Sequence, residues 1–138
     1  MDYKIEVVSI PVTDVDRARD FYVQKAGFVL DHDATVDENI RFVQLTPVGS
    51  ACSIVLGKGL NDMVPGAQKG LMMVVSDVDQ ARGELVSRGL EVSEVDEQQW
   101  GRFIYFADPD GNTWAIQQLP DYSSAEWQEA AAELTDNR

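Results

Sequence analysis

Two stretches of the chain carry the same alternation of apolar and polar residues, 63 positions apart. They read Val-Thr-Asp-Val-Asp-Arg-Ala-Arg at 12–19 and Val-Ser-Asp-Val-Asp-Gln-Ala-Arg at 75–82, with six of eight positions identical. In each copy an apolar, β-branched run comes first and predicts a strand. A Thr-Asp or Ser-Asp pair then offers an oxygen to cap a helix, and apolar residues at i, i+3 and i+7 predict one buried stripe. The repeat therefore predicts two copies of one small α/β unit.

Further strands are expected in the same order in both halves. In the first half, a helix over 15–25 is expected among strands at 1–12, from Phe28 toward Asn39, at 40–45 and at 51–56. In the second, a helix over 78–88 is expected among strands at 71–75, 90–95, 102–107 and 113–119. Residues 57–69 contain four glycines or prolines and are expected to link the halves. A capping-box pattern after Pro120 predicts a last helix at about 123–135.

This order predicts an α+β fold of two tandem βαβββ modules, at about 1–56 and about 70–119, in one domain. Side chains alternate between the two faces of a strand. One face, expected to meet the helices, includes Ile10, Val12, Met73, Val75 and Ile116. The opposite face needs its own cover, which could be a ligand, a partner or the other module.

Composition narrows the possible settings and partners. Apolar residues make up 44% and charged residues 25%, which is typical of a globular protein. No apolar run approaches the roughly 20 residues that span a membrane, and no signal-peptide pattern opens the sequence. The single cysteine, Cys52, favours a cytoplasmic location. The net charge of −13 argues against nucleic acid and anionic membranes as partners, but permits a cationic ligand.

Together, the repeat and one turn motif resemble a known family. The matching segments are Ile-Pro-Val-Thr-Asp at 10–14 followed by Ala18 and Phe21-Tyr22, the second repeat at 75–77, and Phe-Ala-Asp-Pro-Asp-Gly-Asn at 106–112. Over about 5–119 the chain resembles the vicinal oxygen chelate superfamily, also called the glyoxalase/bleomycin-resistance/dioxygenase superfamily. The resemblance implies two curved sheets that form an open cup, with the helices outside.

Metal enzymes of that family carry ligands at four cup positions, which correspond here to Val7, Val55, Gly70 and Ala115. None of these side chains has a donor atom, whereas a divalent ion needs histidine, carboxylate, thiolate or carbonyl donors. We therefore expect no metal and no other cofactor. This departure argues against glyoxalase I and extradiol dioxygenase chemistry.

A small-molecule site in the cup is the alternative, since such sites are mostly apolar with a few polar anchors. The expected ligand-binding residues are Val7, Ser9, Phe42, Gln44, Ser53, Val55, Met72, Trp100, Phe103, Tyr105, Ala115 and Gln117. Trp114 is expected in the core. The acidic residues Asp37, Glu38, Asp96 and Glu97 are expected in loops that could rim the cup. They could attract a cation there, although charged loops are ordinarily just solvated.

Titratable candidates for catalysis are few. His32, the only histidine, lies between two aspartates and is expected to be a solvated, salt-bridging group. Cys52 has no basic neighbour in the sequence and is expected to be buried and inert. Tyr105 and His32 are the only acid–base candidates for the cup, and no catalytic residue is assigned.

Three functions stay open. The first is a metal-independent binding protein that sequesters an aromatic or cationic compound, as homodimeric bleomycin-type resistance proteins do, without catalysis. The second is a glyoxalase-like lyase or isomerase, or a dioxygenase-related enzyme, with a non-standard site. The third is a dimerisation or regulatory module whose cup is filled by its own side chains.

Overall fold

The computed structural model describes residues 1–136 and contains two four-stranded sheets with three helical segments. Sheet one consists of β1 (Val7–Ser9), β2 (Val29–Asp37), β3 (Ile40–Thr46) and β4 (Ser53–Lys58). Sheet two consists of β5 (Leu71–Val75), β6 (Asp96–Gln98), β7 (Gly101–Ala107) and β8 (Thr113–Gln118). The helices are α1 (Val15–Asp20), which continues as the π-helical turn η1 (Phe21–Lys25), then α2 (Val78–Ser87) and α3 (Ala125–Asp136).

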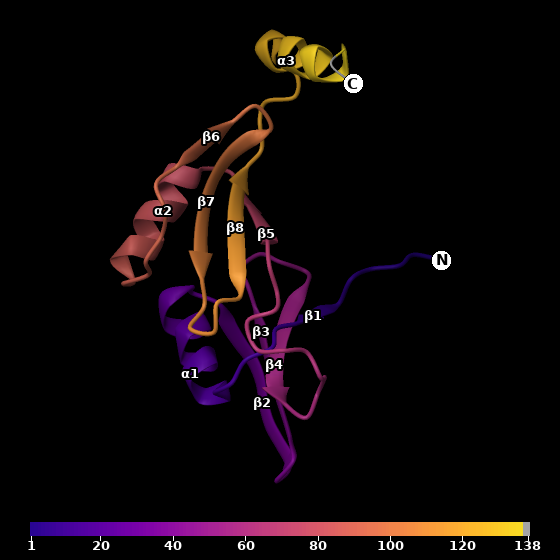
Figure 1. Ribbon diagram of the computed structural model, residues 1–138, viewed down its shortest axis with the longest axis vertical. Coiled ribbons are helices and arrows are strands. Elements are labelled where there is room, and N and C mark those ends of the chain that lie inside the picture. Colours follow the sequence, from indigo (N-terminus) through magenta and orange to yellow (C-terminus); the bar gives the residue numbers. More distant parts are fainter. Residues whose placement is uncertain (137–138) are drawn as a thin grey trace.

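The two sheets have the same topology. Their strand orders are β1-β4-β3-β2 and β5-β8-β7-β6. In each sheet the first strand pairs parallel with the fourth, and the other pairs are antiparallel. The sheets follow one another along the long axis, with α1 and α2 on the same side of the molecule (Figure 1). This architecture confirms the predicted α+β fold of two βαβββ units.

The repeated Asp residues start the two helices in the same way. The side chain of Asp14 accepts a hydrogen bond from the Arg17 backbone N–H, and that of Asp77 accepts one from the Gln80 N–H, both at 3.0 Å. Each bond satisfies an N–H group that has no partner within its helix. The repeat therefore fixes where both helices begin.

The helix-side faces of both sheets form one core. Ile10, Val43, Leu45, Ile54 and Leu56 of the first half and Ile104, Phe106, Trp114 and Ile116 of the second are buried in it. The Tyr22 ring of η1 contacts Trp114 edge to face, with centroids 5.9 Å apart. Trp114 thus lies in the core as predicted, and aromatic packing joins the two modules.

A buried polar network ties the same elements together at the β7–β8 turn. Asp108 accepts hydrogen bonds from the Tyr22 hydroxyl and the Asn112 side-chain amide, both at 2.8 Å. The Asn112 amide also donates to the Pro11 carbonyl, 2.8 Å away. Gly66 of the linker lies against this turn at a φ of +82°, and a Cβ atom there would be 2.3 Å from the Asp110 carbonyl oxygen. The Asp-Pro-Asp-Gly-Asn motif therefore joins module two to module one.

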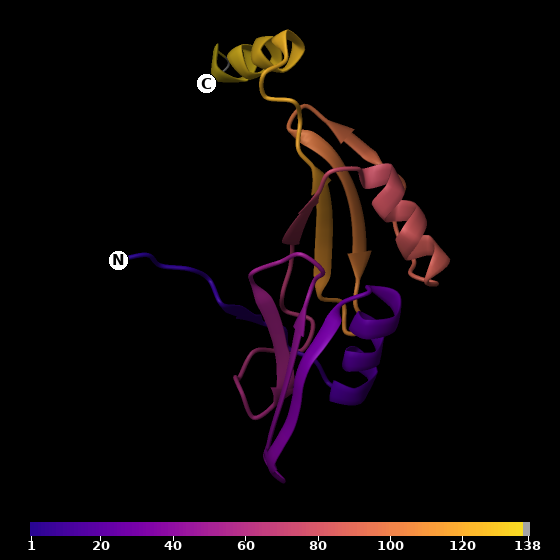
Figure 2. The same cartoon turned by 180° about the vertical axis from the view of Figure 1, so that it is seen from behind.

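Two predicted strands differ from the structure. The strand expected at 1–12 is limited to Val7–Ser9, and the residues before it extend away from the body (Figure 2). The strand expected at 90–95 is instead found at Asp96–Gln98. Ser93 explains the shift, because its hydroxyl accepts the Tyr105 N–H at 2.9 Å, where a strand would offer a carbonyl.

The last helix lies apart from the rest. In both views α3 projects from the end of sheet two (Figures 1 and 2), and in the described part of the chain it packs extensively against no other element. The Ser124 hydroxyl caps it by accepting the Trp127 N–H at 3.1 Å. None of the described helices is long and apolar enough to cross a membrane.

Candidate functional site

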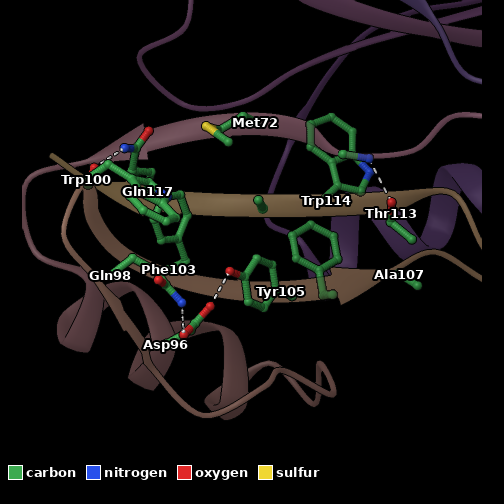
Figure 3. A pocket seen from close by; sticks show the side chains of 13 residues that line it. Met72, Asp96, Gln98, Trp100, Phe103, Tyr105, Ala107, Thr113, Trp114 and Gln117 are labelled. Carbon is green, nitrogen blue, oxygen red and sulfur yellow. Dashed lines mark hydrogen bonds between the residues drawn. The ribbon is translucent and has the colours of Figure 1, made fainter. Parts of the chain in front are cut away.

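Sheet two carries an open pocket on the face turned away from the helices (Figure 3). Its volume is about 740 Å³, which lies within the range of small-molecule sites. The lining residues come from module two, namely Gly70, Met72, Asp96, Gln98, Trp100, Phe103, Tyr105, Phe106, Ala107, Thr113, Trp114, Ala115 and Gln117. Six of the twelve expected ligand-binding residues are therefore brought together here.

The strand register explains why these side chains meet. Directly paired residues on neighbouring strands point to the same face. One row across the sheet is Asp96, Phe103 and Gln117, and the next is Tyr105, Ala115 and Met72. Ala115, which is 6% exposed, forms the floor between larger side chains, whereas Met72 is 56% exposed. The result is a shallow trough that is open to one side.

Aromatic rings form one wall of the pocket. Phe103 and Tyr105 stand two residues apart on β7, with nearly parallel rings whose centroids are 6.2 Å apart. Trp100, 53% exposed, lies in the turn between β6 and β7 at the end of the trough. The side-chain amide of Gln117 donates to the Trp100 carbonyl at 2.8 Å and so holds this turn. Such a wall suits a flat, apolar molecule.

One carboxylate lies at the pocket edge among these rings. Asp96 accepts hydrogen bonds from the Tyr105 hydroxyl at 2.6 Å and from the Gln98 side-chain amide at 2.8 Å (Figure 3). The hydrogen bond to Asp96 raises the pKa of Tyr105 to about 12, and partial burial of the phenol acts in the same direction. Tyr105 is therefore a hydrogen-bond donor at neutral pH.

The other six expected residues lie on sheet one, outside this pocket. Val7, Ser9, Phe42, Gln44, Ser53 and Val55 share one face of that sheet, as shown by the pairs Val7–Ser53, Ser9–Val55 and Gln44–Val55. We call these six residues the module-one face. Gln44 donates to the Ser53 hydroxyl at 3.3 Å, so part of its hydrogen-bonding capacity is used internally. The two faces are equivalent by the repeat but are not joined into one pocket within the chain.

The four family metal positions do not fit a metal ion. The pairing of Ser9 with Val55 on sheet one repeats that of Met72 with Ala115 on sheet two, which supports Val55 as the counterpart of Ala115. Gly70 has a φ of +72°, a conformation that side-chain-bearing residues rarely adopt. Within residues 1–136, no three histidine, cysteine, aspartate or glutamate residues form a group that could hold a metal.

The remaining candidates lie elsewhere. His32 is exposed on β2, opposite Gln44, and lines no part of the pocket. Cys52 is half-buried rather than buried. Of the four acidic residues expected in loops, Asp96 and Glu97 are in β6 and Asp37 ends β2. Glu97 accepts from Arg102 at 2.8 Å on the opposite face of sheet two.

The sequence interpretation named neither Asp96 nor Gln98 among the ligand-binding residues, although it placed Asp96 in a loop that could rim the cup. The strand assigned to 90–95 left both in a loop, so their parity relative to Phe103 was not considered. The alternation of Asp96 and Gln98 on either side of Glu97 was the available signal.

Comparisons with known proteins agree with this architecture. The model of the Glyoxalase/Bleomycin resistance protein/Dioxygenase superfamily matches residues 4–116. TnmS3, an antibiotic binding protein from Streptomyces sp. CB03234, is 35% identical with a TM-score of 0.77, over 86% of this chain and 98% of that chain. A glyoxalase/bleomycin resistance protein from the same strain is 36% identical with a TM-score of 0.72, over 83% and 100% of the two chains. An uncharacterized protein of Shewanella frigidimarina is 28% identical over an alignment that covers 88% of this chain and 97% of that protein. The chain therefore belongs to the Glyoxalase/Bleomycin resistance protein/Dioxygenase superfamily.

Proposed function

We propose that this protein binds a planar aromatic small molecule in the pocket of sheet two, without a metal, and acts by sequestering it. One observation carries the proposal, namely an open, largely apolar trough walled by parallel Phe103 and Tyr105 rings with Trp100 at its end. Flat molecules gain both apolar burial and ring contacts in such a site. The likeness to TnmS3, which is described as an antibiotic binding protein, supports binding rather than turnover.

The chemistry of the pocket also favours binding over catalysis. A general base must be able to give up its proton near neutral pH. Tyr105 has its pKa raised to about 12 and donates to Asp96, so it is a poor base. His32, the other acid–base candidate, is paired with Gln44 on sheet one and so lies outside the pocket of its own chain. Besides Tyr105, the lining residues offer a single acid–base group, the carboxylate of Asp96, which already accepts hydrogen bonds from Tyr105 and Gln98.

The proposal includes a homodimer in which the partner completes the site. The pocket is open, and its rim includes exposed apolar side chains such as Met72 and Trp100. The module-one face carries its own apolar and hydrogen-bonding side chains on the equivalent surface of sheet one. When the module-one face of a second copy lies over the sheet-two pocket, each ligand is enclosed by two related sheets. Enclosure of this kind removes more of a ligand's surface from water.

The test is to fill the pocket floor and measure binding of a neutral planar probe, N-methylacridone, by its fluorescence. Ala115→Phe places a ring where the ligand is expected, so we expect affinity to fall about tenfold or more, as lost burial of about 1.4 kcal/mol would give. Val86→Phe adds the same ring to the exposed surface of α2 and should bind like the wild type. Equal affinities in all three proteins, or no saturable binding to the wild type, would contradict the proposal.

A further inference from the structure

We infer that the ligand is a planar cation, and that Asp96 selects it by facing its positive charge. This inference rests on the proposed function and names the ligand class of the same pocket. Asp96 is the one acidic or basic residue among the lining residues within 1–136. It lies in the same row as Phe103 and Gln117, so a ligand against the rings of β7 meets this carboxylate at its edge.

The carboxylate is held in place without being neutralised. Its two oxygens each accept one bond from a neutral donor, the Tyr105 hydroxyl and the Gln98 amide. A carboxylate has about four acceptor sites, so about half of them stay free. No described lysine or arginine forms an ion pair with Asp96, so no described cationic side chain offsets the charge of this carboxylate.

Two other strand carboxylates, Glu97 and Asp33, have cationic partners. Arg102 contacts Glu97, the neighbour of Asp96, at 2.8 Å and also pairs with Asp79 of α2. On sheet one, Asp33 is paired with both Arg19 and Arg41. Asp96 differs from these two carboxylates in having no described cationic partner, and it is the carboxylate that faces the pocket. A cation bound there would meet a carboxylate that no described lysine or arginine already pairs with.

The surrounding rings favour the same ligand. A cation over the face of tryptophan, tyrosine or phenylalanine is attracted by the ring quadrupole, and the attraction grows where water is excluded. Trp100 and Tyr105, which are 53% and 41% exposed, offer such faces near Asp96, with the buried Phe103 ring stacked behind Tyr105. The net charge of −13 adds a long-range field that raises the local concentration of cations. A flat ring system with a delocalised positive charge would contact the aromatic rings and the Asp96 carboxylate at the same time.

The experiment compares two probes of nearly the same shape, the cation N-methylacridinium and the neutral N-methylacridone. Wild-type protein should bind the cation about tenfold more tightly through contact of its charge with the carboxylate and the ring faces, since N-methylacridinium has no N–H to donate. Asp96→Asn keeps the size and an acceptor but removes the charge, so it should lose this preference while binding the neutral probe as before. Glu97→Gln removes one negative charge from the next residue on the opposite face and should keep the preference.

Each result separates the two proposals. Equal affinity of the wild type for both probes would overturn the charge inference and leave the binding function standing. An equal loss of preference in E97Q and D96N would also overturn it, because the effect would then belong to net charge. Failure of both probes to bind would reject the binding function itself. If D96N also fails to bind the neutral probe, the preference of the wild type for the cation is measured at low and at high salt. A preference that depends on charge must be smaller at high salt, and an unchanged preference would overturn the inference.

Discussion

Tyr22 shows how a single residue links distant parts of this fold. It lies in the π-helical turn η1 of module one, next to the β7–β8 turn of module two. Its hydroxyl donates to Asp108 and accepts the Trp114 indole N–H at 3.0 Å. Burial raises the pKa of Tyr22 well above its usual value, and the nearby Asp108 carboxylate raises it further. The phenol therefore stays protonated and always donates to Asp108.

Tyr22→Phe removes one donor to a buried carboxylate and the acceptor of the Trp114 N–H. Because unsatisfied buried groups cost about 1–3 kcal/mol, we expect the free energy of unfolding to fall by that amount in urea titrations. Tyr3→Phe, at a side chain that is 92% exposed, is the matched control and should stay within about 0.5 kcal/mol of the wild type. A Y22F protein as stable as Y3F would show that the network does not hold the modules together.

Among the helices and strands, those marked by repeated local sequence patterns could be predicted. Those whose position depends on side-chain hydrogen bonds could not. The helix starts at Asp14 and Asp77 and the strand Leu71–Val75 follow from local capping and apolar runs. The position of strand β6 does not follow from such patterns, because Asp96–Gln98 is polar. In addition, the Ser93 hydroxyl accepts the Tyr105 N–H that a strand at 90–95 would have bound through a backbone carbonyl. Asp96 was therefore left outside the site, because its place depends on register with Phe103.

The element least tied to the rest is α3. The family match ends at residue 116, before this helix begins at Ala125. Tyr122 and Trp127 pack edge to face at 4.7 Å, which is a contact within the C-terminal segment itself. We therefore expect the two modules to fold without this helix.

A chain ending at Leu119 should melt within about 2 °C of the full-length protein and bind N-methylacridone equally well. In a chain of this size, a loss of 1 kcal/mol would lower the melting temperature by roughly 4 °C, so scanning calorimetry can detect a contribution of α3. A clear drop in melting temperature, or weaker binding, would mean that α3 stabilises or covers the pocket.

At the scale of the whole molecule, the repeat yields two equivalent faces on sheets that lie end to end rather than face to face. The alternation of side chains along the strands predicted the members of both faces. The six residues of the module-one face share one side of sheet one, and Met72, Phe103, Tyr105, Ala115 and Gln117 share one side of sheet two. The sequence could not give the separation of the faces, which depends on how the modules pack. In the homodimer that we propose, the module-one face of one copy would meet the pocket of the other.

We therefore expect a dimer at micromolar concentration in native mass spectrometry. Val74→Lys should weaken it, because Val74 is 60% exposed on β5, directly paired with Gln117 of the pocket row. Val86→Lys introduces the same charge on α2 and should leave the dimer intact. A monomeric wild type, or equal mass distributions for both variants, would reject the composite site.

The central claim is that this pocket binds its ligand by apolar, aromatic and charge contacts without a metal. Calorimetric titration of N-methylacridinium into protein dialysed against a chelator tests it most directly. The account predicts a saturable isotherm whose affinity is the same with chelator, without it, and after addition of zinc or manganese. Binding that disappears with chelator and returns with added metal would contradict it.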